Sequence, residues 1–151
     1  MSREIGRQPR DSTVKAARSI LPGMQTPRNE GIRVVIAARA AVRRMLHDTL
    51  TEAGMKVTAD CGSAAELLAA VSRDRPDVCV LDRELRGGGL AATAAIASPH
   101  RGPKVLVIGG RGSPAELKAA RLAGAADCIP SDADATRLAD AIEALVRKEQ
   151  R

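Results

Sequence analysis

From Ile32 onward the chain alternates short apolar runs with amphipathic segments, and this alternation limits the possible folds more than any other feature. Each apolar run is followed by a segment whose apolar residues recur at helical spacing. Strict alternation forces parallel strands joined by right-handed crossovers, so we expect a doubly wound, three-layer α/β sheet with helices on both faces. The five expected strands cover 32–37, 56–60, 78–82, 104–109 and 127–130.

Serine residues mark the expected helix starts. Ser63 and Glu66 have the spacing of a capping box, and Ser113 precedes the fourth helix in the same way. Ser131 is expected to cap the last helix, which the pattern places over 133–148.

Residues 1–31 lack this regular pattern and mix Arg, Ser, Pro, Gly and Gln. We expect a basic, flexible tail ahead of a single domain over 32–151, with two amphipathic turns over 13–21 as its one ordered candidate. No apolar stretch has the length of a membrane span and no secretory apolar region opens the chain, so a soluble cytoplasmic protein is expected.

Composition restricts the chemistry further. The chain is 44% hydrophobic but contains no Phe, Tyr or Trp, so it lacks the rings on which single-stranded nucleic acids stack. The net charge of +6 is spread along the chain, which favours a solvated basic surface. The three cysteines, Cys61, Cys79 and Cys128, lack the spacing of a metal site and are expected to be free thiols.

Three motifs together resemble those of bacterial response-regulator receiver domains. They are IAARAAVRR, PDVCVLD, and the stretch from KVLVIGG through AGAADCIPSD. The resemblance runs from about Ile32 to Arg147, and it implies a flavodoxin-like sheet with strand order 2-1-3-4-5. In such sheets functional groups gather at the carboxyl ends of the strands.

The resemblance places Asp82 at the phosphoacceptor position and shows losses at the other functional positions. The acidic pair of the family falls on Ala37 and Ala38. The hydroxyl residue, the aromatic residue and the lysine of the family fall on Gly109, Cys128 and Ser131, respectively.

These losses predict an inactive phosphorylation site. Phosphoryl transfer needs neutralisation of the charge on the phosphoryl oxygens, and Mg²⁺ needs oxygen ligands that two alanines do not supply. We therefore expect weak or absent Mg²⁺ binding, no metal or other cofactor, and no enzymatic activity. Arg39 and Arg83 flank the site in sequence and are candidate charge partners of Asp82.

The expected function is that of an atypical receiver domain in a signal-transduction or transcription-control pathway. It would work independently of phosphorylation, through a protein partner or as a homodimer, with the edge of the last helix as a candidate interface. One alternative is a small-molecule sensor that uses the vacated crevice. Another is a DNA-associated regulator that uses the tail with Arg43, Arg44 and Lys104, and the glycine cluster over 109–112 also offers backbone N–H groups to an anion.

Overall fold

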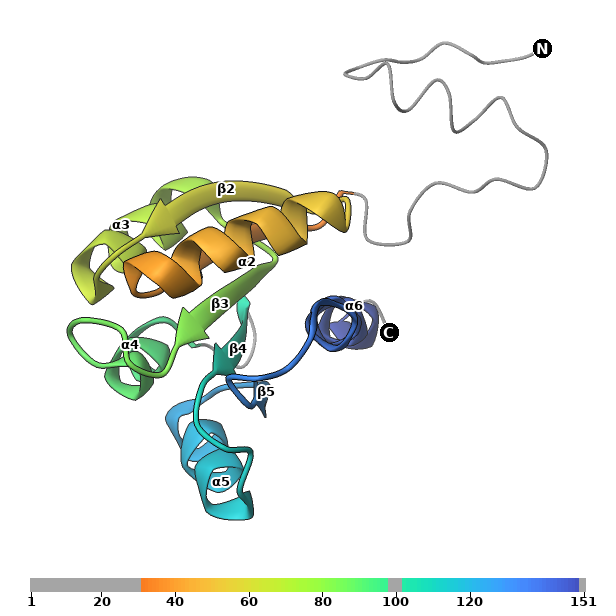
Figure 1. Cartoon of the computed structure of the whole chain (residues 1–151). Coiled ribbons are helices and arrows are strands. Elements are labelled where there is room, and N and C mark those ends of the chain that lie inside the picture. The colour runs from red at the N-terminus through yellow and green to blue at the C-terminus, as the bar shows by residue number, and fades with distance from the viewer. Residues whose placement is uncertain (1–30, 98–101, 150–151) are drawn as a thin grey trace, which may run out of the picture.

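The computed structural model describes residues 31–97 and 102–149, which form a parallel sheet between two layers of helices (Figure 1). The strands are parallel and lie in the order β2-β1-β3-β4-β5, which confirms the expected sheet and its order. Their bounds are β1 (Arg33–Ala37), β2 (Lys56–Cys61), β3 (Val78–Asp82), β4 (Lys104–Ile108) and β5 (Asp127–Ile129).

Helices cover both faces of the sheet, as the near-continuous apolar strands predict. The first face packs against α2 (Ala40–Glu52) and α6 (Ala135–Glu149). The second face packs against α3 (Ala64–Asp74), α4 (Gly89–Ile96) and α5 (Pro114–Ala123). Every residue of β3 is buried, and so is every residue of β1 and β4 except the first.

Branched aliphatic side chains form the core because the chain has no aromatic rings. Leu46 and Leu50 of α2 are fully buried against the first face of the sheet. On α6, Leu138, Ile142 and Leu145 are buried in the same cluster, so most of its apolar stripe serves the core. Each such side chain contributes about 1.5–3 kcal/mol to the free energy of unfolding.

The observed helix caps agree fully with the predicted ones at one helix and differ from them at two. Ser113 and Glu116 form a complete capping box at α5. At α3, Ser63 accepts the N–H of Glu66, but the Glu66 carboxylate accepts the N–H of Gly62 (2.7 Å). The prediction that Ser131 caps the last helix is wrong: α6 begins at Ala135, and the Asp134 carboxylate accepts the N–H of Arg137 (2.8 Å).

The predicted tail and its amphipathic turns over 13–21 lie outside the described residues. None of the helices in the described part of the chain combines the length and the hydropathy that crossing a membrane requires.

Candidate functional site at the carboxyl end of the sheet

Asp82 is the last residue of β3, the central strand, and its side chain is buried at the carboxyl end of the sheet. Only 1% of its surface is exposed. Buried carboxylates are rare unless hydrogen bonds and an opposite charge compensate for the lost water. The partners of this carboxylate therefore determine what the site can do.

Both oxygens of the Asp82 carboxylate are occupied by hydrogen bonds from within the chain. Oδ2 accepts the Arg39 Nε–H (2.7 Å) and the Arg39 backbone N–H (3.0 Å). Oδ1 accepts the Arg39 Nη2–H (3.1 Å) and the Glu84 backbone N–H (2.9 Å). The guanidinium and carboxylate thus form a bidentate ion pair, the strongest class of side-chain hydrogen bonding.

The ion pair fixes the charge state of the site. Burial acts to raise the pKa of the Asp82 carboxyl, but the Arg39 side chain and the two backbone N–H groups outweigh it and hold this pKa below its usual value. The same hydrogen bond raises the pKa of Arg39. The Arg39 side chain remains 54% exposed, so its inner edge binds Asp82 while the rest of the group stays in water.

Magnesium does not fit this arrangement. Ala37 and Ala38, at the end of β1, are fully buried, and their side chains are methyl groups that cannot ligate a metal ion. Mg²⁺ requires oxygen ligands in octahedral geometry, and here both oxygens of the one nearby buried carboxylate already accept two N–H groups each. Among the described residues, no group of three or more His, Cys, Asp or Glu side chains could hold a metal ion.

The other candidate charge partner, Arg83, makes none of the hydrogen bonds to the Asp82 carboxylate. Its backbone N–H continues the sheet by donating to the Ile108 carbonyl (2.8 Å), and its Cβ faces Gly109 at the end of β4. Burial raises the pKa of the Cys128 thiol in β5, and the Arg83 charge opposes that rise. The structure therefore brings Arg39 and Asp82 together, and it places the Arg83 Cβ beside Gly109.

Comparison with known proteins identifies the family. The profile of the response regulator receiver domain matches residues 34–143. The chain belongs to the response regulator receiver domain family. It is therefore related to signalling domains of response regulators.

Solved receiver domains have the same architecture as this receiver domain. The signal receiver domain of the NarL response regulator from Mycobacterium tuberculosis is 26% identical, with a TM-score of 0.71 over 78% of this chain and 98% of that one. A two-component response regulator of the LuxR family from Aurantimonas is 27% identical, with a TM-score of 0.68 over 77% of this chain and 85% of that one.

One longer relative contains a matching region. A protein-glutamate methylesterase/protein-glutamine glutaminase from Paramagnetospirillum magneticum is 32% identical over 124 residues, which are 78% of this chain. The match spans about a third of that protein, 32% of its length. The activity in its name is that of the whole relative.

The expected anion site at the glycine cluster after β4 is already occupied, because a side chain of the receiver domain accepts the N–H groups of the turn. Oε1 of Glu116 accepts the backbone N–H groups of Arg111 (2.9 Å), Gly112 (2.9 Å) and Ser113 (3.1 Å). The sequence therefore supplies its own anion for this turn, and these hydrogen bonds lower the pKa of the Glu116 carboxyl.

Ser131, which the sequence resemblance places at the position of the family's lysine, has a structural role in this receiver domain. The Ser131 hydroxyl donates to the Gly110 carbonyl (3.2 Å), and the Ser131 backbone N–H donates to the same oxygen (3.1 Å). Ser131 therefore ties the loop after β5 to the loop after β4, and its hydroxyl is directed to a backbone carbonyl.

The loop after Asp82 is held in place from two sides. Gly89 passes so close to the backbone that an added Cβ would lie 2.4 Å from the Asp82 carbonyl oxygen. The Arg86 carbonyl accepts the Ala64 N–H (3.0 Å), which joins this loop to the start of α3, and Leu85 is buried beneath it. Glycine is needed at position 89 because any side chain there would push the loop away from the site.

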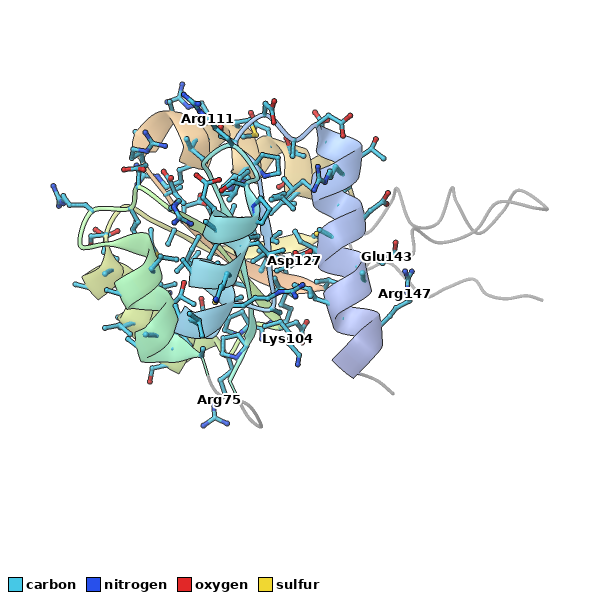
Figure 2. All side chains as sticks on the ribbon, turned by 90° about the horizontal axis from the view of Figure 1, so that it is seen from below. Arg75, Lys104, Arg111, Asp127, Glu143 and Arg147 are labelled. Carbon is cyan, nitrogen blue, oxygen red and sulfur yellow. The ribbon has the colours of Figure 1, made fainter. Side chains whose placement is uncertain are left out.

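The basic residues considered for DNA contact do not form one surface. Arg43 and Arg44 lie in the first turns of α2, beside the carboxyl end of β1, whereas Lys104 is the first residue of β4. Figure 2 shows that Lys104 lies at the same end as Arg75, opposite the end that carries Arg111. The structure therefore separates Lys104 from Arg43 and Arg44 by the length of the sheet.

Proposed function

We propose that this receiver domain works independently of phosphorylation and acts by binding a protein partner, which includes a second copy of the chain. The observation that carries the proposal is the saturation of the Asp82 carboxylate by Arg39 and two backbone N–H groups. A carboxylate oxygen attacks phosphorus through a lone pair, and each oxygen here already accepts two hydrogen bonds. The guanidinium would have to withdraw before the reaction could begin.

The neighbouring positions support the same proposal. A phosphoryl group on Asp82 would need a cation to neutralise its oxygens, and Ala37 and Ala38 offer no side-chain ligands for one. Gly109 has no hydroxyl to bind a phosphoryl oxygen.

The proposal also includes a cytoplasmic location. Three free cysteines, two of them buried, fit a reducing compartment.

The proposal is tested by incubating the full chain with acetyl phosphate and Mg²⁺ and measuring its intact mass. We expect no phosphoryl adduct on the wild-type chain. An Arg39→Ala variant, which frees the carboxylate but restores no metal ligand, is expected to remain unmodified as well. A stoichiometric adduct that is absent from Asp82→Ala would overturn the proposal.

A second measurement addresses the partner. Sedimentation equilibrium of the full chain, with and without acetyl phosphate and Mg²⁺, reports whether self-association depends on phosphorylation. We expect the same association state in both conditions. A change that requires phosphate donor and disappears in Asp82→Ala would contradict a phosphorylation-independent mode.

A further inference from the structure

The guanidinium of Arg43, a residue in the first turns of α2, lies against the backbone of Gly62, which directly follows β2. A Cβ built on Gly62 would overlap the Arg43 Nη1 atom and lie 3.6 Å from the Arg43 Cζ atom. The φ of Gly62 is not positive, so the backbone at this position does not itself require glycine. The absence of a side chain at position 62 is what leaves room for the guanidinium.

The same Arg43 nitrogen binds a peptide group that also contacts Asp82. Arg43 Nη1 donates to the Ala38 carbonyl oxygen (3.3 Å). In a planar trans peptide the carbonyl oxygen and the N–H of the next residue point in opposite directions, and no peptide bond among the described residues is cis. That next N–H belongs to Arg39, and it donates to Asp82 Oδ2 (3.0 Å). One rigid peptide group therefore has a guanidinium at its oxygen and the Asp82 carboxylate at its N–H.

Hydrogen bonds also join the two backbone segments that Arg43 contacts. The Ala38 N–H donates to the Cys61 carbonyl (3.0 Å), and the Gly62 N–H, on the far side of that peptide group, donates to Glu66 Oε1 (2.7 Å). Hydrogen bonds in series polarise one another, so a cation at the Ala38 carbonyl strengthens the N–H donor at the other end of its peptide group. The position of the guanidinium thus affects both the direction and the strength of a bond to Asp82.

We propose that Arg43 is a positioning residue for the Asp82 site, acting through the peptide group between residues 38 and 39, and that Gly62 provides its place. The inference rests on the proposed function and deepens it, because it assigns a second arginine to the holding of the carboxylate. Arg39 binds Asp82 directly, whereas Arg43 fixes the backbone N–H that binds the same oxygen. The occupied state of Asp82 then depends on two arginines that act in different ways.

Hydrogen–deuterium exchange and NMR of the full chain test this role with two different substitutions. Arg43→Met keeps an unbranched side chain but removes the donor. Gly62→Ala keeps Arg43 but puts a methyl group where its guanidinium lies, and the flexible end of the arginine can turn aside without moving the backbone. In both variants we expect the Arg39 amide to exchange at least about tenfold faster, and its proton resonance to move upfield as the bond to the carboxylate weakens.

The controls separate this role from a general contribution to stability. Arg44→Met changes the next residue of the same helix, which is exposed, and should leave the Arg39 amide unchanged. Amides of β4 and β5 should keep their wild-type exchange rates in every variant. Because both substitutions remove the same contact, the double variant of Arg43→Met and Gly62→Ala should have the same effect on the Arg39 amide as either alone.

An unchanged Arg39 amide in Arg43→Met or in Gly62→Ala would overturn the inference, and so would a uniform rise in exchange that includes β4 and β5. Additive effects in the double variant would overturn it as well, since they would mean that the two residues act separately. A phosphoryl adduct on wild-type Asp82 would refute the proposed function, whereas the exchange result for the Arg39 amide would still support the role of Arg43.

Discussion

Replacing Asp82 by asparagine tests the central ion pair through the sign of its effect. Asparagine has the shape of aspartate, but one of its two acceptor oxygens becomes an NH₂ group. Each oxygen of Asp82 accepts two N–H groups, so in either orientation the new NH₂ faces two donors. In a site where several carboxylates repel one another, neutralising one of them stabilises the fold. At Asp82 the same substitution should destabilise the fold, because the carboxylate is paired with a guanidinium.

The expected loss follows from the four hydrogen bonds. Buried donors without acceptors cost about 1–3 kcal/mol in the free energy of unfolding. Because the Arg39 side chain is 54% exposed and can be hydrated, we expect the lower part of that range, about 1–2 kcal/mol. Urea unfolding at pH 7 measures the change, which should move the midpoint by roughly 0.5–1 M with an unchanged slope.

The pH dependence of the free energy of unfolding is a second, independent test of the Arg39–Asp82 pair. The pKa of Asp82 is lowered in the folded state, so its stabilising effect is complete above the pKa of an unfolded aspartate, about 3.9. The effect is lost as the pH falls through the lower folded value. The gap between wild type and Asp82→Asn should therefore close below about pH 4, at a rate no steeper than about 1.4 kcal/mol per pH unit.

Asp48→Asn, at an exposed position on α2, is the control and should change stability by less than about 0.5 kcal/mol. An Asp82→Asn variant as stable as the wild type, or more stable, would show that the carboxylate is not held by the guanidinium as described.

Two further predictions concern other parts of the fold. Arg75 ends α3 with a φ of 48°, so Arg75→Gly should raise the free energy of unfolding by about 0.5–1 kcal/mol in thermal melts, and a loss of stability would contradict the left-handed cap. Glu116→Ala removes the acceptor shared by the N–H groups of 111–113, so these amides should exchange faster in NMR experiments; unchanged protection would mean that the turn does not depend on Glu116.

The sheet was predictable from the sequence because its strands are buried on both faces. Continuous apolar runs such as 78–82 have no polar face to confuse their assignment. Helix starts were less predictable, since several nearby residues can cap the same turn. Asp134 caps α6 because it directly precedes the first helical residue, whereas Ser131 lies ahead of the capping position and its hydroxyl donates to the Gly110 carbonyl.

The site was only partly predictable. From the sequence alone, Arg39 and Arg83 are equally good candidates for the charge partner of Asp82. Which of them pairs with it depends on the side of the sheet to which each side chain points. Consecutive residues of an extended chain point to opposite sides, so Arg83, which follows Asp82 directly, lies on the other side of β3. Arg39 follows β1, the neighbour of β3, and its backbone N–H and side chain reach the same carboxylate. The role of Glu116 was missed because a glycine cluster predicts free N–H groups but not which side chain occupies them.

The positive charge beside Asp82 is part of the polypeptide, and this has a consequence for experiments with cations. A bound ion can be removed by a chelator, exchanged for another metal or diluted away, whereas a guanidinium is present in one copy per molecule under all these conditions. Titration with EDTA, or with Mg²⁺ over its cellular range, should leave the conformation around Asp82 unchanged.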